Sequence, residues 1–140
     1  MTNEKDFTES ARICMERMNR DDQILRGLGI ELLECRPGYS KTRMPLDTRQ
    51  VNGAGIAHGG AIFSLADIAM GLAANGGGGL SLTLSAGINF FKAGKHGPFT
   101  AEAVEINASS KIANYEVSVT DAQGDLVAKL TGIAYKKHTK

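Results

Sequence analysis

A long apolar run near the middle of the chain, residues 61–74, contains one charged side chain, Asp67. Its apolar residues recur at helical spacing on almost every side, and four glycines follow at positions 76–79. The pattern predicts a helix over 59–75 that is buried nearly all round and ends at the glycines. Between Gln50 and Phe91, Asp67 is the only formally charged residue. Because an ionised carboxylate loses its hydration on burial, a carboxylate kept at this position indicates that it has a use.

Beyond this helix the hydrophobic period changes from helical to two, which is typical of strands. In residues 80–90 the even positions are apolar and the odd positions are small or polar, so we expect one long strand with a single apolar face. Further strands are predicted over 99–108, 112–121 and 126–136. Their short connections favour an antiparallel meander of four strands.

The first part of the chain has weaker patterns. They predict a helix over 6–20, a short turn capped at Asp21 or Asp22 that runs through Leu25 and is broken by Gly27 and Gly29, and two strands over 30–35 and 40–44. Residues 50–57 form a loop that leads into the buried helix. The whole chain, residues 1–140, is therefore expected to be a single α+β domain, in which an antiparallel sheet wraps around one long central helix with an N-terminal helix beside it.

Composition narrows the possible functions. The 140 residues carry a formal net charge of +1, no Trp and no basic stripe with interleaved aromatics, which argues against nucleic-acid binding. No apolar run reaches the length of a membrane span, and no secretory signal is visible, so we expect a soluble, cytoplasmic protein without a membrane partner. Two cysteines are too few for a disulfide framework. Neither a metal nor a cofactor is indicated, because His58, His96 and His138 have no ligand-like spacing.

Thioester hydrolysis needs a base or nucleophile together with donors aimed at the oxygen that becomes negative. Asp67 supplies the first. If the helix begins near His58, the amides of Gly59 and Gly60 are unpaired and lie at the positive end of the helix dipole. Asp67 lies eight residues beyond Gly59, about 12 Å along a helix, which is too far for both to reach one carbonyl group. We therefore expect a homodimer in which two antiparallel helices complete each site.

The segment N-G-A-G-I-A-H-G-G-A-I-F-S-L-A-D-I-A, residues 52–69, is followed by Asn75 and by the strand L-T-L-S-A-G-I-N-F-F. These motifs resemble those of the hotdog-fold acyl-CoA thioesterases, in particular the PaaI-like branch. The resemblance extends in element order from about residue 27 to residue 135. It implies a hotdog fold, dimers with a continuous sheet that often pair into homotetramers, and acyl-CoA as the substrate.

The same resemblance implies roles for five residues. The carboxylate of Asp67 activates the attacking water or acts as the nucleophile. The Gly59 amide and the Asn52 side chain polarise the thioester carbonyl, His58 lies beside them, and the Thr83 hydroxyl helps to hold the water. Asp67 would come from one subunit, and Asn52, His58 and Gly59 from its partner.

Each of these residues also has a purely structural interpretation. Asp67 could bond the neighbouring Ser64, His58 could cap the helix, Asn52 could brace its loop, and Thr83 could be an ordinary strand residue. Two other functions remain open: a hotdog hydratase acting on enoyl or hydroxyacyl thioesters, and a non-catalytic acyl-CoA-binding protein. A hydratase would place a His a few residues after the Asp, and no basic residue follows Asp67 until Lys92.

Contacts to the substrate are the least determined part of the site. The candidates along the helix and the following strand are Gly60, Phe63, Ser64, Leu65, Met70 and Phe90, with the N-terminal helix as a further wall of an acyl pocket. The basic loop residues Lys92, Lys95, His96 and Lys111 are ordinary solvated charges by default. As a hypothesis, Lys92 and Lys111 in particular bind the CoA phosphates.

Overall fold

The computed structural model describes the backbone of residues 4–137 and the side chains of residues 9–137. Three helices precede the long strands: α1 (Glu4–Asp21), α2 (Gln23–Leu28) and α3 (Gly59–Asn75). Strands β1 (Glu31–Arg36) and β2 (Tyr39–Met44) lie between α2 and α3. After α3 come β3 (Leu80–Phe90), β4 (Phe99–Ala108), β5 (Ile112–Thr120) and β6 (Leu126–Lys137).

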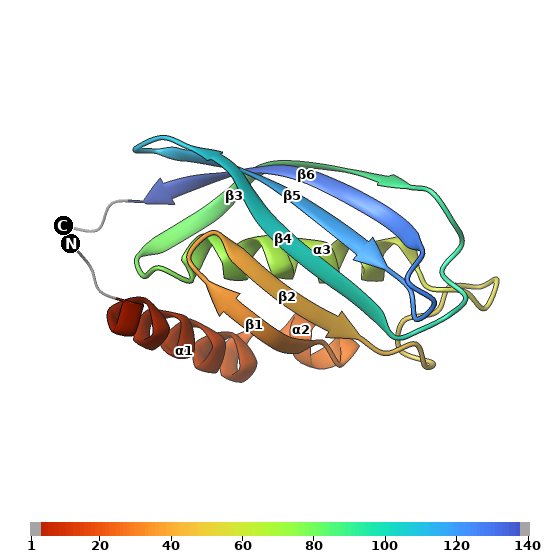
Figure 1. Cartoon of the computed structure of the whole chain (residues 1–140). Helices are drawn as coiled ribbons and strands as arrows, with labels where there is room; N and C mark the ends of the chain where they lie inside the picture. The colour runs from red at the N-terminus through yellow and green to blue at the C-terminus, as the bar shows by residue number, and fades with distance from the viewer. Residues whose placement is uncertain (1–3, 138–140) are drawn as a thin grey trace.

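All six strands form one antiparallel sheet that wraps around α3, with α1 and α2 beside it (Figure 1). This arrangement confirms the predicted α+β class and the hotdog architecture. The predicted end of the short turn at Leu25, before Gly27, is wrong because α2 continues to Leu28. The predicted break at Gly29 is confirmed, since the helix ends there in a left-handed backbone with φ 70°. Among residues 4–137 no helix is both long and apolar enough to cross a bilayer.

The predicted four-strand meander is confirmed for β4, β5 and β6 and is wrong for β3. The strand order is β1-β2-β4-β5-β6-β3, so β3 pairs with β6 at one edge and β4 lies in the middle beside β2. Burial explains the placement: Phe99, Ala101 and Ala103 of β4 are fully buried, whereas Leu82 and Leu84 of β3 are 53% and 61% exposed. Periodicity identifies strands, but it does not identify their partners.

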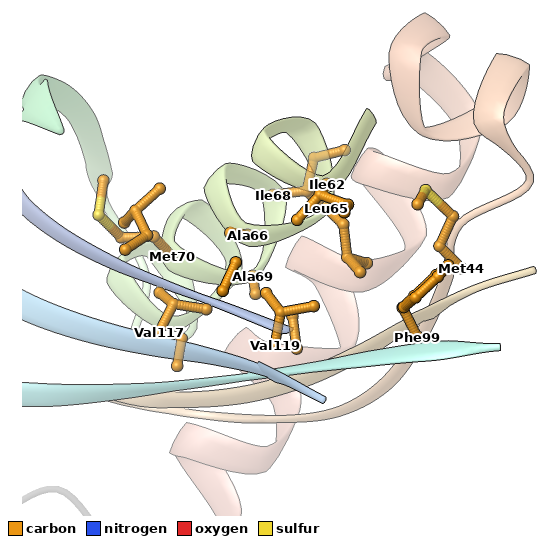
Figure 2. Packing of buried hydrophobic residues seen from close by; sticks show 14 of the residues in the cluster. Met44, Ile62, Leu65, Ala66, Ile68, Ala69, Met70, Phe99, Val117 and Val119 are labelled. Atoms are coloured by element: carbon orange, nitrogen blue, oxygen red, sulfur yellow. The ribbon is translucent and has the colours of Figure 1, made fainter. Parts of the chain in front are cut away.

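The core lies between α3 and the concave face of the sheet (Figure 2). Leu65, Ala66 and Ala69 of α3 are fully buried, as are Val117 and Val119 of β5 below them. Each fully buried leucine or valine contributes about 1.5–3 kcal/mol relative to an exposed side chain. The buried Ser40 hydroxyl of β2 donates to the carbonyl of Ala69, 2.5 Å away, which ties the helix to the sheet. The position of α3 over the sheet is therefore fixed by both packing and a polar contact.

Gly132 of β6 lets α3 approach the sheet closely. A Cβ added there would lie 2.4 Å from Sδ of the fully buried Met70 and 3.3 Å from the carbonyl oxygen of Ser85. Since neither neighbour has open space to move into, we expect Gly132→Ala to lower the free energy of unfolding by about 1–3 kcal/mol. Urea denaturation measures this change in the free energy of unfolding. Gly27→Ala is the control, because its Cβ would meet no atom within 4 Å; equal stabilities of the two variants would contradict the prediction.

Candidate active site

One face of α3 is left uncovered by the sheet. It carries residues spaced three or four apart, all partly or fully exposed in this chain: Gly60, Ser64, Asp67, Gly71 and Asn75. The prediction that α3 is buried nearly all round therefore holds on the sheet side and fails along this stripe, which we call the open stripe. All its residues are small or polar, and Asp67 in the middle is the only charged one.

The Asp67 carboxylate is half-buried and is held by β3. The Thr83 hydroxyl donates to Oδ1 of Asp67 over 3.2 Å. Burial raises the pKa of the Asp67 carboxyl above its ordinary value, the Thr83 hydrogen bond partly lowers it, and the negative charge of Asp22 raises it further. Ser64, the structural alternative, instead donates its hydroxyl to the carbonyl of Gly60 at 2.8 Å. A carboxylate with a raised pKa in a recess is a suitable proton acceptor.

A β-bulge places Thr83 on the helix side of β3. The pairing with β6 shifts between Thr83 and Ser85, so Leu84 is an extra residue in the strand. Thr83 faces α3 before the bulge, and Ala86 and Ile88 pack against the core after it. The prediction of a single apolar face over 80–90 is therefore wrong, because the added residue exchanges the two faces at Leu84.

His58 caps the N-terminus of α3. Its Nδ1 accepts a hydrogen bond from the Gly60 amide at 2.8 Å, so that amide is not a free donor, contrary to the expectation. An accepting Nδ1 carries no proton, which leaves the proton of a neutral His58 on Nε2. The Gly59 amide has no acceptor within the described part of the chain. Gly59 is thus the remaining backbone donor at the positive end of α3.

Asn52 braces the loop before α3 and still has a donor available. Its side-chain oxygen accepts hydrogen bonds from the amides of Ala54 at 2.9 Å and Ile56 at 3.3 Å. No acceptor for its side-chain nitrogen is found among residues 4–137. The bracing role and the proposed donor role therefore use different atoms of one side chain.

Gln50 was not singled out by the sequence, although it organises this loop. Gln50 is 1% exposed. Its side-chain nitrogen donates to the backbone carbonyl of Leu28 at 2.6 Å, and its backbone carbonyl accepts a hydrogen bond from the His58 amide at 2.6 Å. It thereby connects the end of α2 to the start of α3. A glutamine in an uncharged loop carries no periodic signal, so only the fold reveals this contact.

The aromatic candidates lie near the start of α3. The Phe90 ring is 49% exposed, and its Cζ would lie 3.4 Å from a Cβ on Gly59, beside a cavity of about 360 Å³. Phe63 packs partly buried against the core. Leu65 and Met70 are wholly buried in the core, so they do not line an acyl pocket in this chain. The acyl wall must therefore come from other residues.

The two lysine candidates lie in different surroundings. The Lys92 ammonium is 3.0 Å from Asp121 Oδ2 and 2.6 Å from Asp125 Oδ2, so its charge is already balanced. Lys111 precedes β5 at the end of the sheet where β3 begins, whereas Lys92 follows the other end of β3. An eleven-residue strand spans about 35 Å, so the two lysines of one chain cannot line one cleft mouth.

Nothing in residues 4–137 gathers three or more His, Cys, Asp or Glu side chains in a way that could hold a metal ion. His138 lies outside the described residues.

Sequence comparisons agree with this geometry. Residues 54–128, more than half of the chain, match the family model of the thioesterase superfamily. Over 120 residues, 85% of this chain and 78% of the other, the sequence is 37% identical to a provisionally named esterase of Archaeoglobus fulgidus. The acyl-coenzyme A thioesterase PaaI of Escherichia coli is 28% identical over 120 residues, which cover 85% of this chain and 86% of that protein.

Solved structures give the same result. The E. coli PaaI protein from the phenylacetic acid degradation operon matches with a TM-score of 0.89 at 25% identity, covering 96% of this chain and 98% of that chain. A Streptococcus mutans structure bound to acetyl-CoA matches with a TM-score of 0.74 at 26% identity, covering 79% of this chain and 90% of that chain.

The surroundings of Asp67 predict opposite pKa changes in two variants. Thr83→Val removes the hydroxyl that stabilises the charged form, so the pKa of Asp67 should rise. Asp22→Asn removes a negative charge while keeping an oxygen to cap α2, so the pKa should fall. An NMR titration of the Asp67 side-chain carboxyl carbon measures both. Shifts of the same sign would mean that the raised pKa has another cause.

Proposed function

The chain belongs to the thioesterase superfamily, and from that membership we propose that it hydrolyses acyl-CoA thioesters to the free acid and CoA. The relative named acyl-coenzyme A thioesterase and the neighbour with bound acetyl-CoA support this substrate class. The observation that carries the proposal is the half-buried Asp67 carboxylate, which is bonded to Thr83 and has a raised pKa. Burying such a carboxylate lowers the stability of the fold, and a role in hydrolysis explains why the residue is present.

Asp67 would serve either as a general base or as a nucleophile. As a base, it takes a proton from water while the water oxygen bonds to the thioester carbonyl carbon. The tetrahedral intermediate then expels the CoA thiolate, which is protonated to the thiol. As a nucleophile, the Asp67 carboxylate attacks the thioester carbonyl carbon and expels the CoA thiolate, which is protonated to the thiol. Water then hydrolyses the resulting acyl–Asp67 anhydride to the free acid and restores the carboxylate. In both cases the Thr83 hydroxyl orients the Asp67 carboxylate through Oδ1, and Oδ2 is the oxygen left for the reacting atoms.

Charge on the thioester oxygen needs donors, and the Gly59 amide and the Asn52 side-chain nitrogen are the available ones. An eight-residue separation along α3 places Gly59 about 12 Å from Asp67, which exceeds the reach of one carbonyl group. A site made from two chains removes this difficulty. We therefore propose a homodimer in which Asp67 of one subunit works with Asn52, His58 and Gly59 of the other.

The edge of the sheet supports pairing with a second copy. Among residues 4–137, β6 is the only strand that pairs with β3, so the other edge of β3 is open, and its Leu82 and Leu84 are more than half exposed. An open, apolar edge strand favours pairing with another chain. Two copies would join their sheets through β3, and two such dimers would form the tetramer that the resemblance implies.

Asp67→Asn tests the catalytic role. We expect CoA release to fall by about 10²–10⁴-fold, while acyl-CoA still binds. The variant should also be more thermally stable than the parent at neutral pH. A raised folded-state pKa means that ionising Asp67 costs stability as the pH rises through that pKa, and the difference should vanish below the pKa of a free Asp, about 3.9.

The control is Asp21→Asn, at an exposed carboxylate paired with Arg20, which should leave turnover unchanged. Unchanged turnover in Asp67→Asn would contradict the catalytic role and favour a binding protein. Hydration of an enoyl-CoA without thiol release would favour the hydratase.

Mixing two inactive variants tests the shared site. Asn52→Asp keeps an oxygen to brace the loop and removes the donor, so it should lose about 10²-fold or more in kcat. When equal amounts of Asn52→Asp and Asp67→Asn chains exchange subunits, half of the dimers contain one chain of each kind. Each mixed dimer has one intact site, made from Asp67 of the first chain and Asn52 of the second. We therefore expect about a quarter of the parent activity. Mass spectrometry checks that the subunits have exchanged. If the mixture is then no more active than either single variant alone, each site lies within one chain.

A further inference from the structure

A cavity of about 380 Å³ lies between α1, α3 and the segment 78–82, on the side of Asp67 away from His58. Its α1 wall consists of the apolar Ile13, Cys14 and Met18 together with Ser10 and the charged Arg17. Gly71 and Asn75 of the open stripe form its α3 wall. The cavity therefore begins one helical turn from Asp67 and runs toward the C-terminal end of α3.

Gly71 has no structural reason to be glycine in this chain. A glycine inside a helix costs about 0.5–1 kcal/mol relative to alanine. No atom lies within 4 Å of the position that its Cβ would take, and its φ is not positive. Neither close packing nor backbone conformation thus explains the residue. The remaining explanation is that the space above Gly71 is kept free of side-chain atoms so that a bound group can occupy it.

The Asn75 side chain, one of the polar groups that line this space with Ser10 and Arg17, already has its hydrogen bonds within the chain. The Asn75 side-chain nitrogen donates to the carbonyls of Gly71 at 2.8 Å and Ser81 at 3.2 Å, and its oxygen accepts the Ser81 amide at 2.7 Å. Asn75 thus fastens the start of β3 to the end of α3 and offers little to a polar ligand. An occupant of this region would be held mainly by apolar contact.

We propose that this cavity receives the hydrocarbon part of the acyl group, with Gly71 as the residue that opens it and Ile13 of α1 as the opposite wall. The proposal rests on the proposed thioesterase activity. From Asp67 to Asn75 is about 12 Å along the helix, so the cavity suits a medium linear or aryl-substituted acyl group rather than a long fatty chain. The N-terminal helix is then the element that sets acyl preference.

The test fills the cavity from both sides. Gly71→Leu and Ile13→Trp should each lower the ratio of kcat/KM for octanoyl-CoA to that for acetyl-CoA at least tenfold, because each methylene excluded from an apolar site costs about fourfold. Gly71→Ala should have a smaller effect. Asn19→Trp is the matched control, since residue 19 is exposed on the opposite side of α1 and should leave the ratio unchanged.

Binding separates this proposal from the proposed reaction. Calorimetric Kd values for the two acyl-CoAs, measured with Gly71→Leu and Ile13→Trp in an Asp67→Asn background, should show the same loss of octanoyl preference whether or not Asp67 is catalytic. An unchanged ratio in both assays overturns the acyl pocket. Dissociation of the Gly71→Leu oligomer in sedimentation also overturns it, because Gly71 would then be a packing position against a second copy.

Discussion

The close packing of α3 against the sheet determines where chemistry can occur in this molecule. Small residues on both sides, such as Ala69 of α3 and Gly132 of β6, allow the approach, and the Ser40 hydroxyl secures it. Once that side is filled, a single narrow face of the helix remains open. Asp67 lies on this face, where it loses enough water to have a raised pKa and yet stays within reach of a substrate.

The positions on either side of Asp67 can be understood from the same constraint. Bulky residues would close the open stripe, and further charges would restore the water that burial removes. The stripe instead carries glycine, serine and asparagine, whose polar groups are largely bonded within the chain. One stretch of helix thus combines a packed side with an accessible side, and α1 and α2 each line a cavity beside it.

The sequence predicted the parts that depend on local pattern. The length of α3, the position of each strand and the isolation of Asp67 all follow from periodicity and from the absence of neighbouring charges. Strand order did not follow, because the fully buried Ala101 and Ala103 of β4 show their central place only once α3 is packed above them. The Asp22 charge beside Asp67 and the buried Gln50 depend on how distant segments meet, so no spacing in the sequence indicates them. His58 was recognised as a helix-start residue, but its choice of the Gly60 amide is a matter of side-chain rotamer.

The bulge at Leu84 makes the register of β3 part of the site. If the strand kept Leu84 but lost the bulge, either the Thr83 hydroxyl would turn to the outer surface of the sheet or Ala86 and Ile88 would leave the core, because odd and even positions would then face opposite sides throughout. A relative that lacks the extra residue can keep its threonine on the inner face with regular strand pairing. A one-residue gap at this point of an alignment is therefore no sign that the contact to the helix carboxylate is lost.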